Sequence, residues 1–239
     1  MAHSATIRHN QNEAGGSYRS MGEQQQELPV TRRAATLAVR DLVCSRGDRV
    51  LFAPTSFGAA PGDIVWLRGA NGQGKTTLLR TLAGLSAPSA GAIAWQDAGD
   101  DAPRLVYLAH ANAIKDELTV RESLRFLLDL ADAQVDDADV DAALERFGLL
   151  SRRDAFVRTL SQGQRRRVAL ARLAAQREPL PWLLDEPFDA LDAAGVDALA
   201  TLIAEHARRG ASVVLTSHVP VPIADPVPVQ VHLHEPAFA

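Results

Sequence analysis

The chain has 239 residues, enough for one large domain or two small ones with a substantial buried core. Hydrophobic residues make up 46% and charged residues 23%, a balance typical of globular proteins, which excludes a fibrous or wholly disordered chain. The formal net charge of −4 and the 5% of aromatic residues give no sign of a nucleic-acid or anionic-lipid surface. The single cysteine, Cys44, excludes an internal disulfide and a thiolate zinc cluster, and fits a reducing compartment.

The first 34 residues are polar and rich in turn-forming residues, with few apolar side chains to offset the entropy of ordering. We therefore expect residues 1–34 to form a disordered tail, with Met21 as a candidate alternative start. The folded domain is expected to span residues 35–239. No apolar run in the chain approaches the ~20 residues of a membrane helix, so any work at a membrane is expected to depend on partners.

Short apolar runs alternate with helical patterns along the rest of the chain. Strands are predicted at residues 37–43, 49–52, 64–67, 105–108, 182–184 and 212–215. A helix is predicted after Gly74 from the spacing of Leu78, Leu79, Leu82 and Leu85. A mostly helical segment at about 111–177 is expected to form a subdomain inserted into the sheet. The fold class is therefore α/β with a parallel sheet.

A glycine-rich loop follows the strand at 64–67 and opens the next helix. It matches the phosphate-loop pattern G-x-x-x-x-G-K-[ST] with the residues Gly69, Ala70, Asn71, Gly72, Gln73, Gly74, Lys75, Thr76 and Thr77. Backbone amides of such a loop surround phosphates, Lys75 reaches the β and γ oxygens, and Thr76 offers its hydroxyl to Mg²⁺. The alternative, a glycine turn before a core helix, does not account for the Lys-Thr pair.

Two carboxylates end the apolar run Trp182-Leu-Leu-Asp-Glu186. This placement predicts that Asp185 binds Mg²⁺ at the sheet edge, as in phosphate-loop ATPases, and that Glu186 polarises the attacking water. Without the phosphate loop, an Asp-Glu pair after a strand would be read as a surface turn.

The segment Leu160-Ser-Gln-Gly-Gln164 predicts a helix start, with Ser161 as the N-cap and Gln164 completing a capping box. The free amides of this helix N-terminus could also bind a second phosphate surface. Arg165, Arg166 and Arg167 follow directly, and we expect them to form a solvated or partner-facing surface.

In combination and order, these motifs resemble the ATP-binding subunits of ABC transporters. The resemblance rests on GANGQGKTT (69–77), LSQGQ (160–164), LLDEP (183–187), ALD (190–192) and TSH (216–218). It implies a phosphate-loop ATPase fold with a parallel core sheet, a small antiparallel β subdomain and an inserted helical subdomain. It also implies a head-to-tail homodimer in which Ser161, Gly163 and Gln164 contact ATP bound to the other chain, Asp192 lies at the interface and His218 acts as the switch histidine.

Two departures from the general pattern narrow the resemblance to the haem-exporter ATPases of bacterial cytochrome c maturation. His110 stands where most ABC subunits have a glutamine, and no adenine-stacking aromatic residue lies near Ser45 and Arg46, so adenine contact is expected from Arg46 or Val50. The segments 49–52, 107–110, 114–119 and 183–192 also match that family. The resemblance implies an ATPase on the cytoplasmic face of the inner membrane, bound to membrane-spanning subunits of a haem-handling complex. Hydrolysis would drive release of the haem-loaded periplasmic chaperone.

Two other functions stay open from the sequence: an ATPase for another small export cargo, and a soluble ABC ATPase acting on nucleic acid. The acidic balance and the single ATPase domain count against the second. His232 and His234 form a His-x-His pair that could suggest haem or metal binding. Their alternation with Val229, Val231 and Leu233 places them instead on the solvent side of an edge strand.

Overall fold

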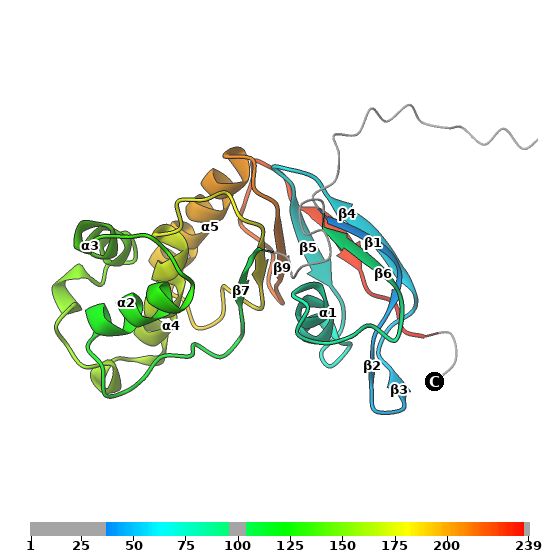
Figure 1. Cartoon of the computed structure of the whole chain (residues 1–239), viewed down its shortest axis with the longest axis horizontal. Coiled ribbons are helices and arrows are strands. Elements are labelled where there is room, and N and C mark those ends of the chain that lie inside the picture. The colour runs from blue at the N-terminus through cyan, green and yellow to red at the C-terminus, as the bar shows by residue number, and fades with distance from the viewer. Residues whose placement is uncertain (1–36, 96–103, 237–239) are drawn as a thin grey trace, which may run out of the picture. The chain divides into compact units, whose positions relative to one another are not determined.

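The computed structural model describes residues 37–95 and 104–236 (Figure 1). The tail predicted over residues 1–34 lies outside the described residues. The strands are β1 Leu37–Val43, β2 Ser45–Arg46, β3 Arg49–Val50, β4 Thr55–Ala59, β5 Ile64–Arg68, β6 Ala90–Trp95, β7 Val106–Leu108, β8 Trp182–Leu184, β9 Val213–Thr216 and β10 Val229–His232. The helices are α1 Lys75–Leu82, α2 Val120–Leu130, α3 Asp137–Arg146, α4 Gln162–Ala174 and α5 Ala193–Arg208, with short 3₁₀ turns at Leu150–Arg152 and Val157–Thr159.

A five-stranded parallel sheet forms the centre of the domain, in the order β10-β5-β9-β8-β7. The residues of β8 and β9 are all buried, as are the first four of β5, which explains why these strands read as continuous apolar runs. Four of the predicted strands are confirmed as β5, β7, β8 and β9, each within one residue at either end. The strand carrying His232 is confirmed at the sheet edge, and His232 and His234 are both exposed.

The smaller sheet is antiparallel, in the order β4-β1-β6, and a separate hairpin pairs β2 with β3. The predicted strand at 37–43 is confirmed as β1. The predicted strand at 49–52 is wrong beyond Val50, because Phe52 leaves the hairpin and is fully buried in the core. Strands β4 and β6 were not predicted, since their glycines and small, partly exposed side chains give no clear alternation.

Each of the helices α2, α3 and α4, which lie between β7 and β8, starts at a capping box. The N-caps are Thr119, Asp136 and Ser161, and the side chain three residues later bonds back to each cap amide. This confirms the predicted cap at Ser161.

The prediction that Leu85 continues helix α1 is wrong. The helix ends at Leu82 in a Schellman motif, in which the Leu85 amide donates to the Arg80 carbonyl, and Leu85 is exposed.

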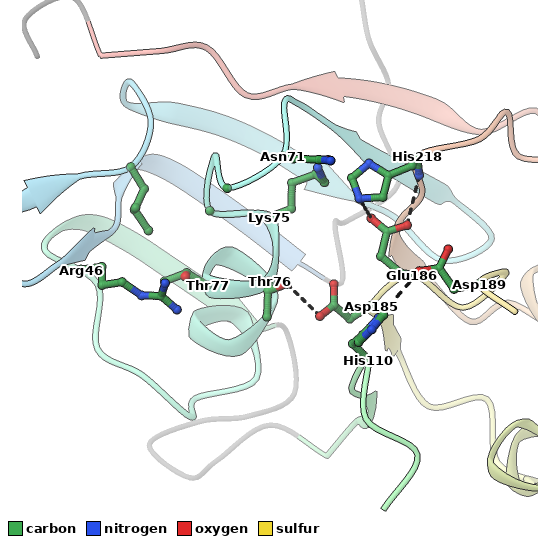
Figure 2. Close-up of a pocket in the computed structure, with 13 residues that line it drawn as sticks. Arg46, Asn71, Lys75, Thr76, Thr77, His110, Asp185, Glu186, Asp189 and His218 are labelled. Atoms are coloured by element: carbon green, nitrogen blue, oxygen red, sulfur yellow. Dashed lines mark hydrogen bonds and ion pairs between the residues drawn. The ribbon is translucent and has the colours of Figure 1, made fainter. Parts of the chain in front are cut away.

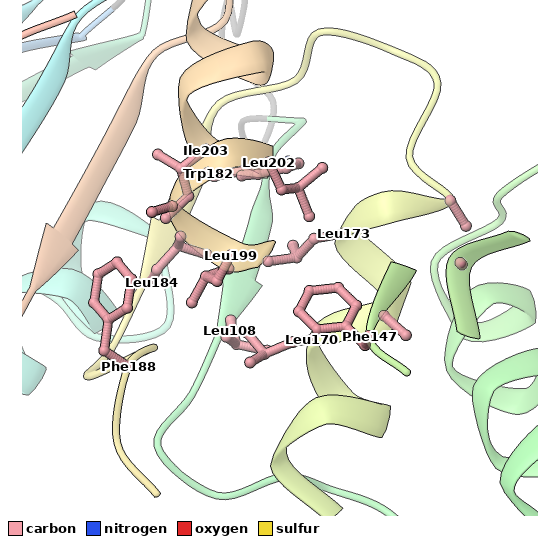
Figure 3. Packing of buried hydrophobic residues seen from close by; sticks show 14 of the residues in the cluster. Leu108, Phe147, Leu170, Leu173, Trp182, Leu184, Phe188, Leu199, Leu202 and Ile203 are labelled. Carbon is pink, nitrogen blue, oxygen red and sulfur yellow. The ribbon is translucent and has the colours of Figure 1, made fainter. Parts of the chain in front are cut away.

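Two hydrophobic clusters cover the two faces of the parallel sheet. Alternate residues of one strand enter different clusters: Trp182 and Leu184 pack with α4 and α5, whereas Leu183 packs with α1 and β1. Figure 3 shows the first cluster, where Trp182 and Leu184 lie beside Leu199 and Ile203 of α5. With both faces covered, the carboxyl ends of the strands are the edge at which polar residues can gather.

A neutral histidine is locked into the first cluster. His206 of α5 is fully buried and stacks on Trp182, with ring centroids 3.6 Å apart. Its Nε2 lies 2.8 Å from the Leu180 carbonyl and its Nδ1 lies 2.9 Å from Nη2 of Arg209. A carbonyl only accepts and a guanidinium only donates, so Nε2 carries the proton. Burial lowers the pKa of His206 from 6.5 to about 4; the Leu180 bond opposes this and the Arg209 charge adds to it.

This depressed pKa predicts an acid-sensitive fold. Protonation favours the unfolded state, so the contribution is complete above pH 6.5 and is lost as the pH falls towards about 4. The loss should amount to about 3 kcal/mol in the free energy of unfolding. The free energy of unfolding, measured with urea at each pH, should fall for the wild type and approach that of His206→Gln as the pH is lowered. A wild-type curve that runs parallel to that of the variant would contradict the assignment.

Candidate functional site

The phosphate loop connects the end of β5 to the start of α1 and is braced by its own side chains. Nζ of Lys75 donates to the carbonyls of Gly69 at 2.9 Å and Ala70 at 3.2 Å. The Gln73 side chain accepts from the Ala70 amide and donates to the carbonyl of Leu233, beside β10. The loop is therefore fixed from both sides before any phosphate binds.

Gly74 is required for the turn into α1. Its φ is +94°, and a Cβ added there would lie 2.8 Å from Cβ of Leu51. A side chain at this position would strain the backbone and collide with the neighbouring segment. Gly74, Lys75 and Thr76 all line the pocket, so the N-terminus of α1 lies where a bound phosphate would meet it.

A pocket of about 310 Å³ lies at the carboxyl edge of the sheet and gathers most of the predicted site residues (Figure 2). Its lining includes Asn71, Gly72, Gly74, Lys75, Thr76, Thr77, His110, Asp185, Glu186 and His218. Ala70 and Gln73 line a neighbouring hollow of about 500 Å³, and Gly69 contributes its carbonyl to Lys75.

Asp185 joins three elements through one buried carboxylate. Oδ2 accepts from the Thr76 hydroxyl of α1 at 2.8 Å, and Oδ1 accepts from the Thr216 hydroxyl of β9 at 3.0 Å. Asp185 itself follows β8 and is 1% exposed. A hydroxyl and a carboxylate side by side form the oxygen donor set that suits Mg²⁺, which is typically held by one or two carboxylates, phosphates and water. The residues present therefore fit this metal.

Glu186 faces the pocket from a constrained backbone. Its φ is +46°, its amide donates to the Thr216 hydroxyl at 2.8 Å, and its Oε2 accepts from the His218 amide at 3.1 Å. Oε1 lies 3.2 Å from Nε2 of His218, yet among the described residues this buried oxygen has no hydrogen-bond partner. Burial raises the pKa of Glu186, and the charge of His218 opposes that rise. A buried carboxylate oxygen that accepts no hydrogen bond from the described residues, on a group whose pKa is raised, suits a proton acceptor.

Two residues of the pocket lining were not predicted, Asp189 and Leu51. Oδ2 of Asp189 lies 3.8 Å from Nδ1 of His110; the side chain of His110 is exposed and that of Asp189 is half-buried. The sequence signal that could have placed Asp189 in the pocket is its position three residues after Glu186. Of the two candidates for adenine contact, Arg46 lines the pocket, whereas Val50 lines the neighbouring hollow.

The residues predicted from LSQGQ and ALD lie apart from this pocket. They line a separate hollow of about 440 Å³ formed by Ser161, Gly163, Gln164, Arg167, Ala190 and Asp192. Asp192 caps α5 by accepting from the Gly195 amide, and it also forms an ion pair with Arg167. A Cβ on Gly163 would lie 2.8 Å from the Ala190 carbonyl, so a larger residue there would push this segment away from α4.

The expectation that Arg165, Arg166 and Arg167 form a solvated or partner-facing surface is wrong for Arg166. Arg166 is 3% exposed, and the other two are partly buried in ion pairs with Asp116 and Asp192. The helical spacing contained a usable signal, since Arg166 shares one face of α4 with the residues three, four and seven positions later, which are Ala169, Leu170 and Leu173. All of these are buried.

Comparison with known proteins agrees with this site. The family model described as ABC transporter matches residues 52–189. The cytochrome c biogenesis ATP-binding export protein CcmA of Dechloromonas aromatica is 49% identical over 78% of this chain and 94% of its own length. The protein of the same name from Vibrio cholerae is 45% identical over 76% of this chain and 90% of its own.

Solved structures give the same result for the fold. An ATP-binding subunit of an ABC transporter aligns with a TM-score of 0.71 and 26% identity, over 83% of this chain and 86% of that one. A putative ABC transporter ATP-binding protein from Pyrococcus furiosus aligns with a TM-score of 0.70 and 26% identity, over 82% and 96% of the two chains.

The fold and the pocket define an ATP-binding domain of the ABC type. Within that class, the chain belongs to the family of ATP-hydrolysing ABC transporter subunits that includes the CcmA proteins. In residues 37–95 and 104–236, no helix combines the length and apolar character that a membrane crossing needs.

The Thr216 hydroxyl yields a prediction. Thr216→Val keeps the shape but removes the group that binds both Asp185 and the Glu186 amide. Leaving these buried groups without a partner should lower the free energy of unfolding by about 1–3 kcal/mol, and ATP hydrolysis should fall at least about tenfold. Urea unfolding and ATPase assays would measure both effects. Thr216→Ser, which keeps the hydroxyl, is the control, and equal activity in the two variants would refute this role.

Proposed function

We propose that this chain is the ATPase subunit of a membrane ABC complex that delivers haem for cytochrome c maturation, at the cytoplasmic face of the bacterial inner membrane. The observation that carries the proposal is the 49% identity with a relative named as a cytochrome c biogenesis export protein, which extends over nearly the whole of that relative. The nucleotide pocket supports the ATPase half of the proposal independently of any name.

In this proposal, the ATP phosphates lie against the loop amides and Lys75. The ammonium of Lys75 exchanges its bonds to the Gly69 and Ala70 carbonyls for bonds to phosphate oxygens. Thr76 and Asp185 would hold Mg²⁺, which when bound neutralises negative charge on the phosphates. Arg46 and Leu51 also line the pocket and would contact the adenine ring.

Glu186 accepts a proton from the attacking water in this scheme. Its Oε1 is the buried oxygen that has no hydrogen-bond partner among the described residues, and it borders the same pocket as Lys75. His218 binds Oε2 through its backbone amide, and its ring lies beside Oε1, so it orients the carboxylate. His110 faces the pocket from the loop after β7, where we propose that it replaces the glutamine of other ABC subunits.

The hollow that contains Ser161 and Asp192 supports a homodimer. Ser161, Gly163, Gln164 and Asp192 lie together but outside the pocket of their own chain, as expected if they meet ATP bound to a second copy. We propose that residues 35–239 form the ATP-binding domain. Its helical segment, about 111–177, would pass the closing motion to membrane-spanning subunits.

Replacing Glu186 tests the catalytic scheme. Glu186→Gln removes the proton acceptor but keeps the shape, so the rate of ATP hydrolysis should fall about 10²–10⁴-fold while ATP stays bound. Single-turnover assays and retention of labelled ATP would measure the two effects separately. Lys75→Ala is the control that should instead weaken ATP binding. Undiminished turnover in Glu186→Gln would refute the assignment.

The haem role is tested in cells. A deletion strain should lose holocytochromes c, measured by haem staining of membrane proteins, and the wild-type gene should restore them. Lys75→Ala should not restore them, because the ATP-driven step is lost. Normal holocytochromes in a deletion strain that lacks a redundant copy would leave the ATPase assignment intact and point to another export cargo.

A further inference from the structure

Arg166 makes five hydrogen bonds from a single buried guanidinium. Nη1 donates to the carbonyls of Ala109 and His110 and to Oδ1 of Asn112, at 3.2, 3.1 and 3.0 Å. Nη2 donates to the carbonyls of Asp185 and Glu186, at 3.2 and 2.7 Å. One side chain of α4 therefore binds two separate loops that border the nucleotide pocket.

The two loops follow neighbouring strands of the parallel sheet. Residues 109–112 follow β7 and carry His110, whereas residues 185–186 follow β8 and carry the two carboxylates. Strand pairing fixes their distance only as far as Leu108 and Leu184, where the register ends. Beyond that point, the Asp185 amide donates to the Leu108 carbonyl, Nδ1 of His110 lies 3.8 Å from Oδ2 of Asp189, and the hydrogen bonds of Arg166 bridge the two loops.

The charge on Arg166 is held without a direct ion pair to any residue that the structure describes. All five acceptors are neutral, four of them backbone carbonyls and one a side-chain amide. Burial lowers the pKa of Arg166, and the nearby carboxylates of Asp189, Asp185 and Glu186 oppose that shift. Burying a charge costs free energy that an apolar side chain of similar size would avoid. Packing alone therefore does not account for an arginine at this position.

The bond to Glu186 fixes an unfavourable backbone. Glu186 has a φ of +46°, a conformation that a non-glycine residue keeps only when its surroundings impose it. Its amide is held by Thr216 and its carbonyl by Arg166, so both ends of the residue are fixed. These two bonds fix the backbone from which the carboxylate extends, and His218 holds the carboxylate itself.

We infer that Arg166 is a positioning residue for ATP hydrolysis, which sets the places of Glu186 and His110 relative to each other. It acts through the backbone, and it does not itself line the pocket. The inference rests on the proposed role of Glu186. Helix α4 begins after Ser161, which is proposed to contact ATP on a second copy. The inference gives the same helix a further role, which is to position Glu186 and His110 of its own chain.

The test compares Arg166→Lys with Arg172→Lys in the full-length chain. Arg172 is the matched control, because it also extends from α4 into the interior but makes a single hydrogen bond to the described residues, to the Tyr107 carbonyl within β7. Lysine keeps the charge but not the planar fork that serves both loops. We expect Arg166→Lys to lower kcat about 10–100-fold and to change KM for ATP less than about threefold. Arg172→Lys should keep kcat within about threefold of the wild type.

Hydrogen–deuterium exchange provides a readout that does not depend on turnover. Peptides covering residues 109–112 and 185–189 should exchange faster in Arg166→Lys and remain protected in Arg172→Lys. Unchanged exchange, wild-type kcat in Arg166→Lys, or an equal loss of kcat in both variants would overturn the inference. If Arg166→Lys does not fold, Arg166→Gln takes its place, and failure of both to fold would show that the residue serves folding alone.

Glu186→Gln, assayed in parallel, separates this inference from the proposed function. If Glu186→Gln hydrolyses ATP at the wild-type rate, the proposed catalytic scheme fails whatever Arg166 does. If Glu186→Gln is inactive while Arg166→Lys is fully active with unchanged exchange, only the inference fails.

Discussion

The carboxylate of Asp185 is the interaction on which the rest of the site depends. It lies at the end of β8 and binds hydroxyls from α1 and β9, so one side chain joins three elements that are far apart in the sequence. Removed from water, a carboxylate is stable only when its oxygens are bonded, and here each oxygen accepts from one threonine. The bond from Thr76 fixes where the phosphate loop ends relative to the sheet edge. Lys75 and Glu186 face a common pocket as a consequence.

Around this carboxylate the backbone is held in conformations that local preferences do not favour. Glu186 and Ala190 both have positive φ values, +46° and +61°, within five consecutive residues. The segment keeps this shape because Thr216 and Arg166 hold Glu186 from both ends, and because Gly163 leaves room for the Ala190 carbonyl. The strain therefore lies where carboxylate direction matters most, while the strands that carry the segment are regular and buried.

The sequence predicted the parts of the fold whose signal is local. Buried strands such as β8 appear as apolar runs, and the cap at Ser161 appears as a side-chain pattern, so both could be placed without tertiary knowledge. Strand β6 was not predicted, because its small, partly exposed residues show no alternation of apolar and polar side chains. Its pairing with β1 is made by backbone hydrogen bonds, which leave no signal in the sequence. In the site, the phosphate loop and the two carboxylates were predictable from motifs.

Arg166 was not predictable from its immediate neighbours. It sits between Arg165 and Arg167, and nothing in that run distinguishes the three. Successive residues of a helix point about 100° apart, so only the apolar stripe later in α4 reveals which arginine turns inward. Its hydrogen-bond acceptors lie in two loops, one more than fifty positions before it and the other about twenty positions after it. Sequence reasoning cannot predict that these two loops lie next to each other.

Helix α4 links the nucleotide pocket to the hollow lined by Ser161 and Asp192. Ser161 caps its first turn beside Asp192, and Arg166 extends from its second turn to the loops of the nucleotide pocket. A rise of 1.5 Å per residue separates these positions by about 7.5 Å along the helix axis, too short a span for the helix to absorb a displacement by bending. In the proposed dimer, the Ser161 end meets ATP on the second copy while Arg166 holds Glu186 and His110 of its own copy. If the ATP bound to the second copy shifts α4, Arg166 would therefore move Glu186 beside the ATP bound to its own copy.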